Sequence, residues 1–494
     1  MSRRSLCVLR HGPLTVYLKP LDGCANLSAF VETLPPDVPA IWLDSARQHP
    51  VTGRWSMVGC HPWLRFSARG DRLELRTSAA TQRWRGHPLE GLRRILRRYR
   101  APHASIPQAR ALGLMGFLSY DLNRWIERLP APQPSGSSVP EMLWLGMRLV
   151  VLVDHAEQRS WLLSLVDPHS PGAVARREAL GELERATDRL TERFSELAEA
   201  DGAESASGWS SLQATSTQAE FERMVSKALE SIRAGEIFQA NVSQRFTASW
   251  RGRAWPLYRR LRKINPSPFA CWFSCDDLTV VSCSPERLAL VQDGRISTRP
   301  IAGTRPRGEN PVDDAVNSLE LLLSEKERAE HLMLVDLERN DLGRVCTAGS
   351  VSVDELMTLE SYSHVLHIVS EVSGCLRRGT DAVDVIRAAF PGGTITGCPK
   401  VRCMEILREL EPVARGLYTG SLGRLGFDGS MDLNIAIRTI VIQGDRLSFH
   451  VGAGIVADSL PEREYQETLA KAAALKSALE TAGALPQGTD ARVG

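Results

Sequence analysis

The sequence lacks paired cysteine motifs, long apolar runs and a strong net charge. Its ten cysteines are scattered without a CxxC pair or zinc-type spacing, which predicts unpaired thiols in a reducing compartment. No run approaches the roughly 20 apolar residues of a membrane helix, and Arg10 and His11 interrupt any signal-peptide core. A formal net charge of +2 gives no overall attraction to nucleic acid or membrane. We therefore expect a soluble cytoplasmic protein without a nucleic-acid or membrane partner.

Glycine-rich nucleotide motifs are also missing. The segment from Phe390 to Lys400 (FPGGTITGCPK) packs glycine and proline around Thr394 and Thr396. Its spacing matches neither a Walker loop nor a dinucleotide fingerprint, so a nucleotide is not indicated. Backbone N–H groups in such a turn, just before a helix, suit a carboxylate ligand. A structural turn and an anion cradle explain the segment equally well.

The chain divides into four parts by composition. Residues 1–200 alternate short strand-like runs with polar turns, and residues 201–217 are small and polar, as in a linker. Residues 218–482 combine helices with strands in successive hairpins, and residues 483–494 form a flexible tail. This order predicts an α+β, mostly antiparallel structure. The arginine-rich run 83–100 is interpreted as a solvated helix face, with a docking surface as the alternative.

Local signals mark two helices and a hairpin in the second half. Thr217 and Glu220 fit a capping box, and the apolar residues that follow repeat at helical spacing until Gly235. A second helix is expected over 313–336. Within 282–308, Asp293-Gly294 predicts a tight turn between a strand that carries Glu286 and a strand that runs into Thr304.

Two acidic pairs suggest a metal site. Glu327 and Glu330 lie three apart on the second helix. Near the C-terminus, Ser459 is expected to cap a helix on which Glu464, Glu467 and Lys471 share one face. Oxygen ligands from separate elements suit Mg²⁺. For either pair alone, a solvated or salt-bridged helix face is the better interpretation. Arg438 is interpreted as a carboxylate clamp or a structural ion pair, and His367 as a core histidine.

Together these segments resemble the chorismate-utilising enzymes, which include anthranilate synthase component I, aminodeoxychorismate synthase component I, and isochorismate and salicylate synthases. The resemblance is dense over 218–482, the chorismate-binding catalytic domain, and it extends to 1–200 as the N-terminal domain of the anthranilate synthase component I type. It implies two large, mostly antiparallel β-sheets packed face to face with helices outside.

The resemblance also implies roles for individual residues. Glu286 matches the general acid/base, His367 a catalytic or ring-orienting histidine, and Thr304 a catalytic-site hydroxyl. Residues that match the Mg²⁺-site acids are Glu327, Glu330, Glu464 and Glu467. Residues that match substrate-binding positions are Gln239, Ala302, Thr394, Tyr418, Arg438, Gly452, Gly454 and Lys471. A possible tryptophan pocket comprises Asp44, Ser45, Asn265, Pro266, Pro268 and Phe269.

Three features narrow the choice within the family. Gln239 stands where water-activating relatives have lysine, so it resembles the ammonia-using members. The segments LDSA, GRWS and GFLSYDLNRWIERLP in the first half resemble the aminodeoxychorismate synthase branch, as does FPGGTITGCPK. One feature opposes it, because Ala302 replaces a lysine that many such enzymes carry. The resemblance therefore implies 4-amino-4-deoxychorismate as product, for 4-aminobenzoate and folate biosynthesis.

Two alternatives remain open: anthranilate synthase component I of the tryptophan pathway, and a non-catalytic regulator that binds chorismate or tryptophan. The sequence contains no G-x-C-x-G glutaminase elbow. A separate glutamine amidotransferase subunit is therefore expected to supply the ammonia.

Overall fold

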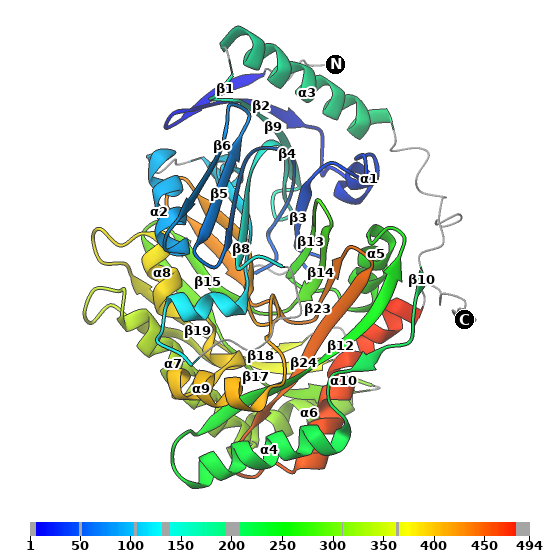
Figure 1. Cartoon of the computed structure of the whole chain (residues 1–494), viewed down its shortest axis with the longest axis vertical. Coiled ribbons are helices and arrows are strands. Elements are labelled where there is room, and N and C mark those ends of the chain that lie inside the picture. Colours follow the sequence, from blue (N-terminus) through cyan, green and yellow to red (C-terminus); the bar gives the residue numbers. More distant parts are fainter. Residues whose placement is uncertain are drawn as a thin grey trace, which may run out of the picture.

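A computed structural model describes residues 6–48, 52–102, 106–130, 139–170, 172–192, 208–308, 310–361 and 365–480. Its strands pair in antiparallel fashion and connect into one 24-stranded sheet, around which the helices pack (Figure 1). The predicted α+β, antiparallel class is confirmed. The two separate sheets are not observed, because hydrogen bonds link all the described strands. Residues 201–207 of the predicted linker, and the tail, lie outside the described residues.

Two long strands explain why the sheet is continuous. Strand β4 (Trp55–Arg69) pairs first with β3 (Ala40–Asp44) and, further along, with β5 (Arg72–Thr77). Strand β8 (Met142–Asp154) follows it throughout, across a register shift between Pro62 and Leu64. A bulge bends a strand and increases its twist. The sheet therefore curves around its core instead of dividing into two.

The two halves of the chain share this sheet and its core. Strand β3 pairs with β13 (Phe269–Cys275), and β7 (Gly113–Leu118) pairs with β21 (Ser421–Gly426). Behind these pairings, the rings of Phe117 and Phe273 meet edge to face with centroids 5.6 Å apart. Both side chains are fully buried, and the burial of each stabilises the folded state by about 2 to 3 kcal/mol. Figure 1 shows the early strands, blue to cyan, above β12 (Gln239–Arg251), β24 (Arg446–Ile455) and α10 (Pro461–Glu480).

The first predicted helix is confirmed. Helix α4 (Gln218–Arg233) begins with the capping box, in which the Thr217 hydroxyl accepts from the Glu220 N–H and the Glu220 carboxylate accepts from the Thr217 N–H. Its buried residues are Phe221, Met224, Val225, Ala228 and Leu229. They pack against Val242, Ala453 and Ile455 of β12 and β24.

The second predicted helix is two helices. Helix α6 (Pro311–Leu323) ends at Ser324, where the backbone is extended, and α7 (Glu325–Gly343) begins with the Ser324 hydroxyl accepting from the Glu327 N–H. Helix α10 begins at Pro461, as expected. Ser459 lies one residue too early to cap it, and its hydroxyl instead accepts from the Val456 N–H.

The predicted hairpin is confirmed. Strands β15 (Arg287–Gln292) and β16 (Arg295–Arg299) pair across Asp293 and Gly294, whose φ angles of 54° and 74° are both positive. Such angles match the right-handed twist of the flanking strands. Strand β14 (Leu278–Ser284) ends before Glu286, and β17 (Ile301–Pro306) carries the segment beyond the hairpin. The placement of Glu286 on a strand is wrong: Glu286 lies in the short connection between β14 and β15.

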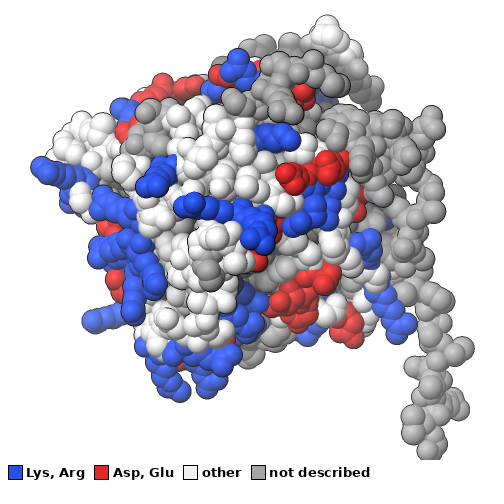
Figure 2. Space-filling model, turned by 90° about the horizontal axis from the view of Figure 1, so that it is seen from above, with Lys and Arg blue, Asp and Glu red and all other residues white. Residues whose placement is uncertain are grey.

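The arginine-rich run forms ion pairs between the two halves. On α2 (Pro88–Arg98), Arg93 binds Asp381 and Asp384 at the start of α8 (Ala382–Ala389), and Arg97 also approaches Asp381. Figure 2 shows the molecule from above, with basic side chains gathered along the left edge and the larger acidic groups right of centre. Within the described ranges, no helix is long and apolar enough to cross a membrane.

Candidate functional site

Glu286 is a buried carboxyl group in a basic setting. Its side chain is 6% exposed. Burial raises its pKa to about 7, against the opposing effects of the Thr394 hydroxyl, the Ile301 backbone N–H and the positive charges of Arg438 and Lys471. A group that titrates near neutral pH can both give and take a proton, as a general acid/base must. Thr394, on the short helix η3 (Gly393–Ile395) of the predicted glycine-rich segment, is near enough to lower this pKa, although its buried hydroxyl makes no hydrogen bond to the described residues.

His367 lies beside this carboxyl region on β19 (Val365–Cys375). It stands opposite Thr304 in the β17–β19 pairing, and its Nδ1 lies 3.0 Å from the Gly303 carbonyl oxygen. Since a carbonyl only accepts, Nδ1 carries the hydrogen and Nε2 is left as an acceptor. Burial lowers the His367 pKa to about 4, so the ring is neutral at pH 7. Ala302 pairs with Ile368 immediately before a register shift at Gly303.

The four predicted metal-site glutamates face one another from two helices. Burial raises the pKa of Glu330, and the charges of Glu327, Glu464 and Glu467 raise it further. The pKa of Glu464 is likewise raised, by burial and by the charge of Glu467. Three cations stand nearby: Arg305 pairs with Glu327 at 3.1 Å, Lys326 with Glu330 at 3.8 Å, and Lys471 with Glu467 at 2.7 Å.

This acidic group fits a hard cation. One buried oxygen of Glu330, which has only the Lys326 ammonium at 3.8 Å, and one of Glu464 make no hydrogen bond to the described residues, and buried acceptors without a hydrogen bond are costly unless something binds them. Within the same ranges, no three acidic, histidine or cysteine side chains converge as a complete metal site. Mg²⁺ keeps several water or substrate oxygens in addition to one or two carboxylates. The donor set therefore suits an ion shared with substrate.

Two glycines in β24 allow close approach of predicted substrate-binding groups. A Cβ at Gly452 would meet the Tyr418 hydroxyl at 2.8 Å, and one at Gly454 would meet the Gln239 side-chain nitrogen at 2.8 Å. Lys471 donates to the Gly452 carbonyl at 3.1 Å. These contacts bring the predicted substrate residues of β12, β24 and α10 to one wall. The side-chain oxygen of Gln239 is buried and unsatisfied within the described structure.

Arg438 forms a hydrogen bond with Asn265, a partner that was not predicted for it. Its backbone has a positive φ of 51°, and its guanidinium donates to the Asn265 side-chain oxygen at 3.2 Å. Its charge also acts on Glu286 and on His367. Asn265, expected in a tryptophan pocket, is thus positioned beside the substrate residues.

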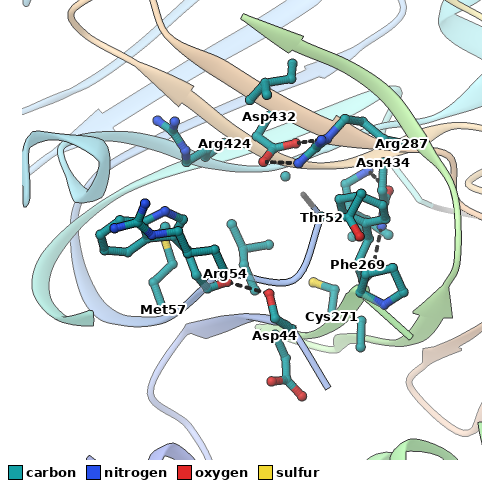
Figure 3. Close-up of a pocket in the computed structure, with 18 of the residues that line it drawn as sticks. Asp44, Thr52, Arg54, Met57, Phe269, Cys271, Arg287, Arg424, Asp432 and Asn434 are labelled. Atoms are coloured by element: carbon teal, nitrogen blue, oxygen red, sulfur yellow. Dashed lines mark hydrogen bonds and ion pairs between the residues drawn. The ribbon is translucent and has the colours of Figure 1, made fainter. Parts of the chain in front are cut away.

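Only some of the predicted tryptophan-pocket residues line one cavity. Asp44, Ser45, Pro268 and Phe269 line a cavity of about 210 Å³ between the two halves of the chain, whereas Asn265 and Pro266 do not. Figure 3 shows Arg287 and Asp432 facing each other on one wall of this cavity, with Asp44 and Cys271 on the opposite side. The arginines that line it were not anticipated, because they come from distant segments without a common spacing.

Sequence reasoning also missed Glu338. It is 6% exposed on α7, and burial raises its pKa, as do Asp341 and Glu286. Asp341 in turn pairs with Lys400 of the glycine-rich segment. The spacing of Glu327, Glu330, Glu338 and Asp341 places all four on one helical face. That spacing was the available signal for an acidic face that extends beyond the metal pair.

Comparison with known proteins places this site in context. Residues 39–477 match the family model described as chorismate binding enzyme. An anthranilate synthase component I-like protein of Synechocystis sp. is 46% identical over 374 residues, covering 74% of this chain and 73% of that protein. Aminodeoxychorismate synthase component 1 of Bacillus subtilis is 44% identical over 368 residues, covering 74% and 77%.

A solved structure shares the fold. The crystal structure of anthranilate synthase component I from Streptococcus pneumoniae TIGR4 has a TM-score of 0.75 and 30% sequence identity, and the match covers 87% of this chain and 93% of that one. The similar proteins therefore carry two different product names.

Proposed function

We propose, from the premise that the chain belongs to the chorismate binding enzyme family, that it converts chorismate to 4-amino-4-deoxychorismate. The chain is a chorismate-utilising amination enzyme, and its relatives divide between two products. The observation that best supports catalysis at this site is the pKa of Glu286. This buried carboxyl has a pKa of about 7, so it can hold a proton at neutral pH and give it to a leaving group.

In the first step the leaving group is the C4 hydroxyl, which leaves poorly unless it is protonated. Ammonia attacks C2 of chorismate, both ring double bonds shift by one position, and the C4 hydroxyl leaves as water with a proton from Glu286, while the ammonium formed at C2 gives up a proton. Arg438 and Lys471 offset the charges of the two substrate carboxylates. His367 is neutral and orients the ring through its Nε2 acceptor, because its Nδ1 hydrogen is donated to Gly303.

The acids of α7 and α10 would hold Mg²⁺. Glu327, Glu330, Glu464 and Glu467 form the proposed ligand group, in which one oxygen of Glu330 and one of Glu464 make no hydrogen bond to the described residues. When bound, Mg²⁺ supplies positive charge that binds a substrate carboxylate and polarises the substrate. The residues of this chain then provide the proton transfer and the remaining carboxylate contacts.

Gln239 supports ammonia instead of water as the nucleophile, and the N-terminal segments and FPGGTITGCPK support the 4-amino product. Ala302 cannot serve as a nucleophile at C2, so no covalent adduct with the enzyme forms at this position. The amine must instead reach C4 by a second displacement, in which another ammonia attacks C4 and the C2 amine leaves as ammonia. Anthranilate synthase chemistry is the alternative, and Ala302 is the residue that favours it.

The ammonia requires a source. Two of the similar proteins are named as component 1 or I of a synthase, which implies a second component. We propose that a glutamine amidotransferase subunit supplies ammonia to this chain, which itself lacks a G-x-C-x-G motif.

A product assay tests this function. The purified chain is incubated with chorismate, Mg²⁺ and an ammonium salt, and products are identified by mass and fluorescence. Accumulation of 4-amino-4-deoxychorismate is expected. Anthranilate formed without an added lyase would instead support the anthranilate synthase alternative. No turnover, with chorismate binding retained, would support a regulator.

A further inference from the structure

A second carboxyl group is buried close to the Glu286 region and has no part in the reaction as proposed so far. Glu338, on α7, is 6% exposed. A Cβ at Gly393 would lie 3.7 Å from a Glu338 carboxylate oxygen, so this carboxyl group contacts the short helix η3. The next residue of that helix, Thr394, is near enough to Glu286 to lower its pKa. Helix η3 is therefore adjacent to two buried carboxyl groups that come from separate elements.

The charged groups around Glu338 come from three elements. They are Asp341 on its own helix, Lys400 at the start of α9 (Lys400–Leu410), and Glu286 in the connection between β14 and β15. Asp341 is 2% exposed and already pairs with Lys400. The lysine charge is therefore largely offset before it acts on Glu338, and two negative charges oppose the ionisation of that carboxyl.

These surroundings keep a proton on Glu338. Burial raises its pKa, and the charges of Asp341 and Glu286 raise it further. Thr298 on β16 is near enough to lower this pKa, although its buried hydroxyl makes no hydrogen bond to the described residues. A buried carboxylate whose nearby cation is already paired is costly. Glu338 therefore keeps its proton at a pH where an exposed glutamate has lost it.

The two carboxyl groups differ in the cations that they face. The positive charges of Arg438 and Lys471 favour the ionised form of Glu286. The lysine that acts on Glu338 is held by an aspartate instead. Of the two groups, Glu286 thus ionises first, and its negative charge then holds the proton on Glu338 more tightly. After Glu286 has given its proton away, the pair still holds one proton.

We infer that Glu338 and Glu286 share protons, and that Glu338 returns a proton to Glu286 once Glu286 has protonated the departing C4 hydroxyl. The inference rests on the proposed function, and it makes Glu338 a positioning residue that acts only through Glu286. The Thr394 hydroxyl both donates and accepts hydrogen bonds, so it can pass the proton between the two groups.

The protons balance in this scheme. One proton moves from Glu286 to the C4 hydroxyl, which leaves as water, and one moves from Glu338 to Glu286. The ammonium formed at C2 gives up one proton, and one proton returns to Glu338 from solvent. Each turnover therefore ends with both carboxyl groups in their starting states.

Infrared titration of the full chain tests the shared proton without requiring turnover, because a protonated carboxyl has a C=O stretching band that a carboxylate lacks. At pH 7, Glu338→Gln is expected to lose one such band. The matched control is Asp336→Asn on the same helix, where the side chain is 72% exposed, and it is expected to keep the band. In Glu286→Gln, the Glu338 band is expected to titrate about one pH unit or more below its position in the parent, because the opposing charge is gone. An undiminished band in Glu338→Gln, or an unshifted titration in Glu286→Gln, would overturn the inference.

Turnover of chorismate with Mg²⁺ and an ammonium salt distinguishes a proton source from a packing role. Glu338→Gln keeps the size of the side chain but cannot release a proton, so kcat is expected to fall on the order of tenfold while KM for chorismate stays nearly constant. Glu338→Asp is shorter but keeps the carboxyl group, and its kcat is expected to stay within about threefold of the parent. A packing role predicts the reverse order, so a greater loss in Glu338→Asp than in Glu338→Gln would overturn the inference.

Failure of the proposed function has a different signature. A parent chain without turnover would contradict that function, while the infrared titration would still decide whether the two carboxyl groups share protons. Circular dichroism confirms that each variant is folded, so that a lost band or a lower kcat is not mistaken for unfolding.

Discussion

At the scale of single residues, the pKa of Glu286 is determined by burial and by nearby charges together. Removal from water favours the neutral carboxylic acid, while Arg438 and Lys471 favour the carboxylate, and the balance lies at a pKa of about 7. Without burial, the group would be ionised at neutral pH and could not protonate a leaving hydroxyl. Without the two cations, it would hold its proton too tightly to recover it.

Replacing Glu286 with glutamine is expected to abolish turnover while chorismate still binds, because the amide keeps the shape of the side chain but cannot transfer the proton. Calorimetric binding and product analysis check both parts. Turnover close to that of the parent would contradict the acid/base role, and lost binding would show a damaged site instead.

The same variant also reports on the pKa. A native pKa of about 7 against an ordinary value of 4.5 means that ionising Glu286 destabilises the fold progressively as pH rises between these values. The penalty is small at pH 5 and reaches about 3 kcal/mol at pH 8. Glu286→Gln is therefore expected to gain stability relative to the parent at pH 8 and much less at pH 5. Urea unfolding at both pH values measures this, and an equal difference at the two would contradict the raised pKa.

At the scale of elements, the bend in β17 depends on Gly303. Its φ is 64°, and a Cβ there would meet a Leu321 methyl carbon at 2.9 Å and a Glu327 carboxylate oxygen at 3.1 Å. Gly294 in the hairpin turn has a similar φ of 74° but open space around it. Gly294→Ala is expected to cost about 1 kcal/mol for backbone strain alone. Gly303→Ala is expected to cost about 2 to 4 kcal/mol because steric overlap adds to the strain. Equal losses in urea unfolding would contradict the close approach.

The acidic faces of α7 and α10 predict a metal-dependent stability. Without a divalent ion, the four glutamates repel one another, so Mg²⁺ is expected to raise the melting temperature of the parent. Glu330→Gln and Glu464→Gln are each expected to reduce this Mg²⁺-dependent increase and to weaken Mg²⁺ binding by about tenfold or more. Glu325→Gln, on an exposed part of α7, is the control. Scanning calorimetry with and without Mg²⁺ tests this, and an undiminished increase in both variants would exclude these ligands.

Elements governed by near neighbours could be predicted from the sequence. The capping box of α4 and the Asp293-Gly294 turn depend on contacts within a few residues, and both are confirmed. Ser324 is also a local capping signal, but the apolar pattern that continues across it concealed the break between α6 and α7. Arg110 and Arg424 line the same cavity because β7 and β21 pair across the chain. No periodicity in the sequence encodes that pairing, so the cavity between the two halves could not be foreseen in full.

At the scale of the whole molecule, the division suggested by composition does not correspond to a division of the sheet. Strands before residue 170 pair with strands after residue 260 at β3–β13 and β7–β21. The Arg93 ion pairs with Asp381 and Asp384 add a third link. Each half therefore supplies hydrogen-bond partners and apolar cover that the other half needs.

This arrangement predicts that a fragment of residues 208–480 does not fold alone. It would expose the edges of β13 and β21 and the ring of Phe273, and unpaired strand edges with apolar faces promote aggregation. The fragment is expected to be insoluble or to unfold without cooperativity, whereas coexpression with residues 1–200 is expected to restore soluble protein and turnover. The matched control is the full chain with a protease site inserted in the predicted linker. Once cut, its halves are expected to remain associated in size-exclusion chromatography. A monomeric fragment with a sharp unfolding transition would show that the C-terminal half is an independent domain and that the shared sheet is dispensable.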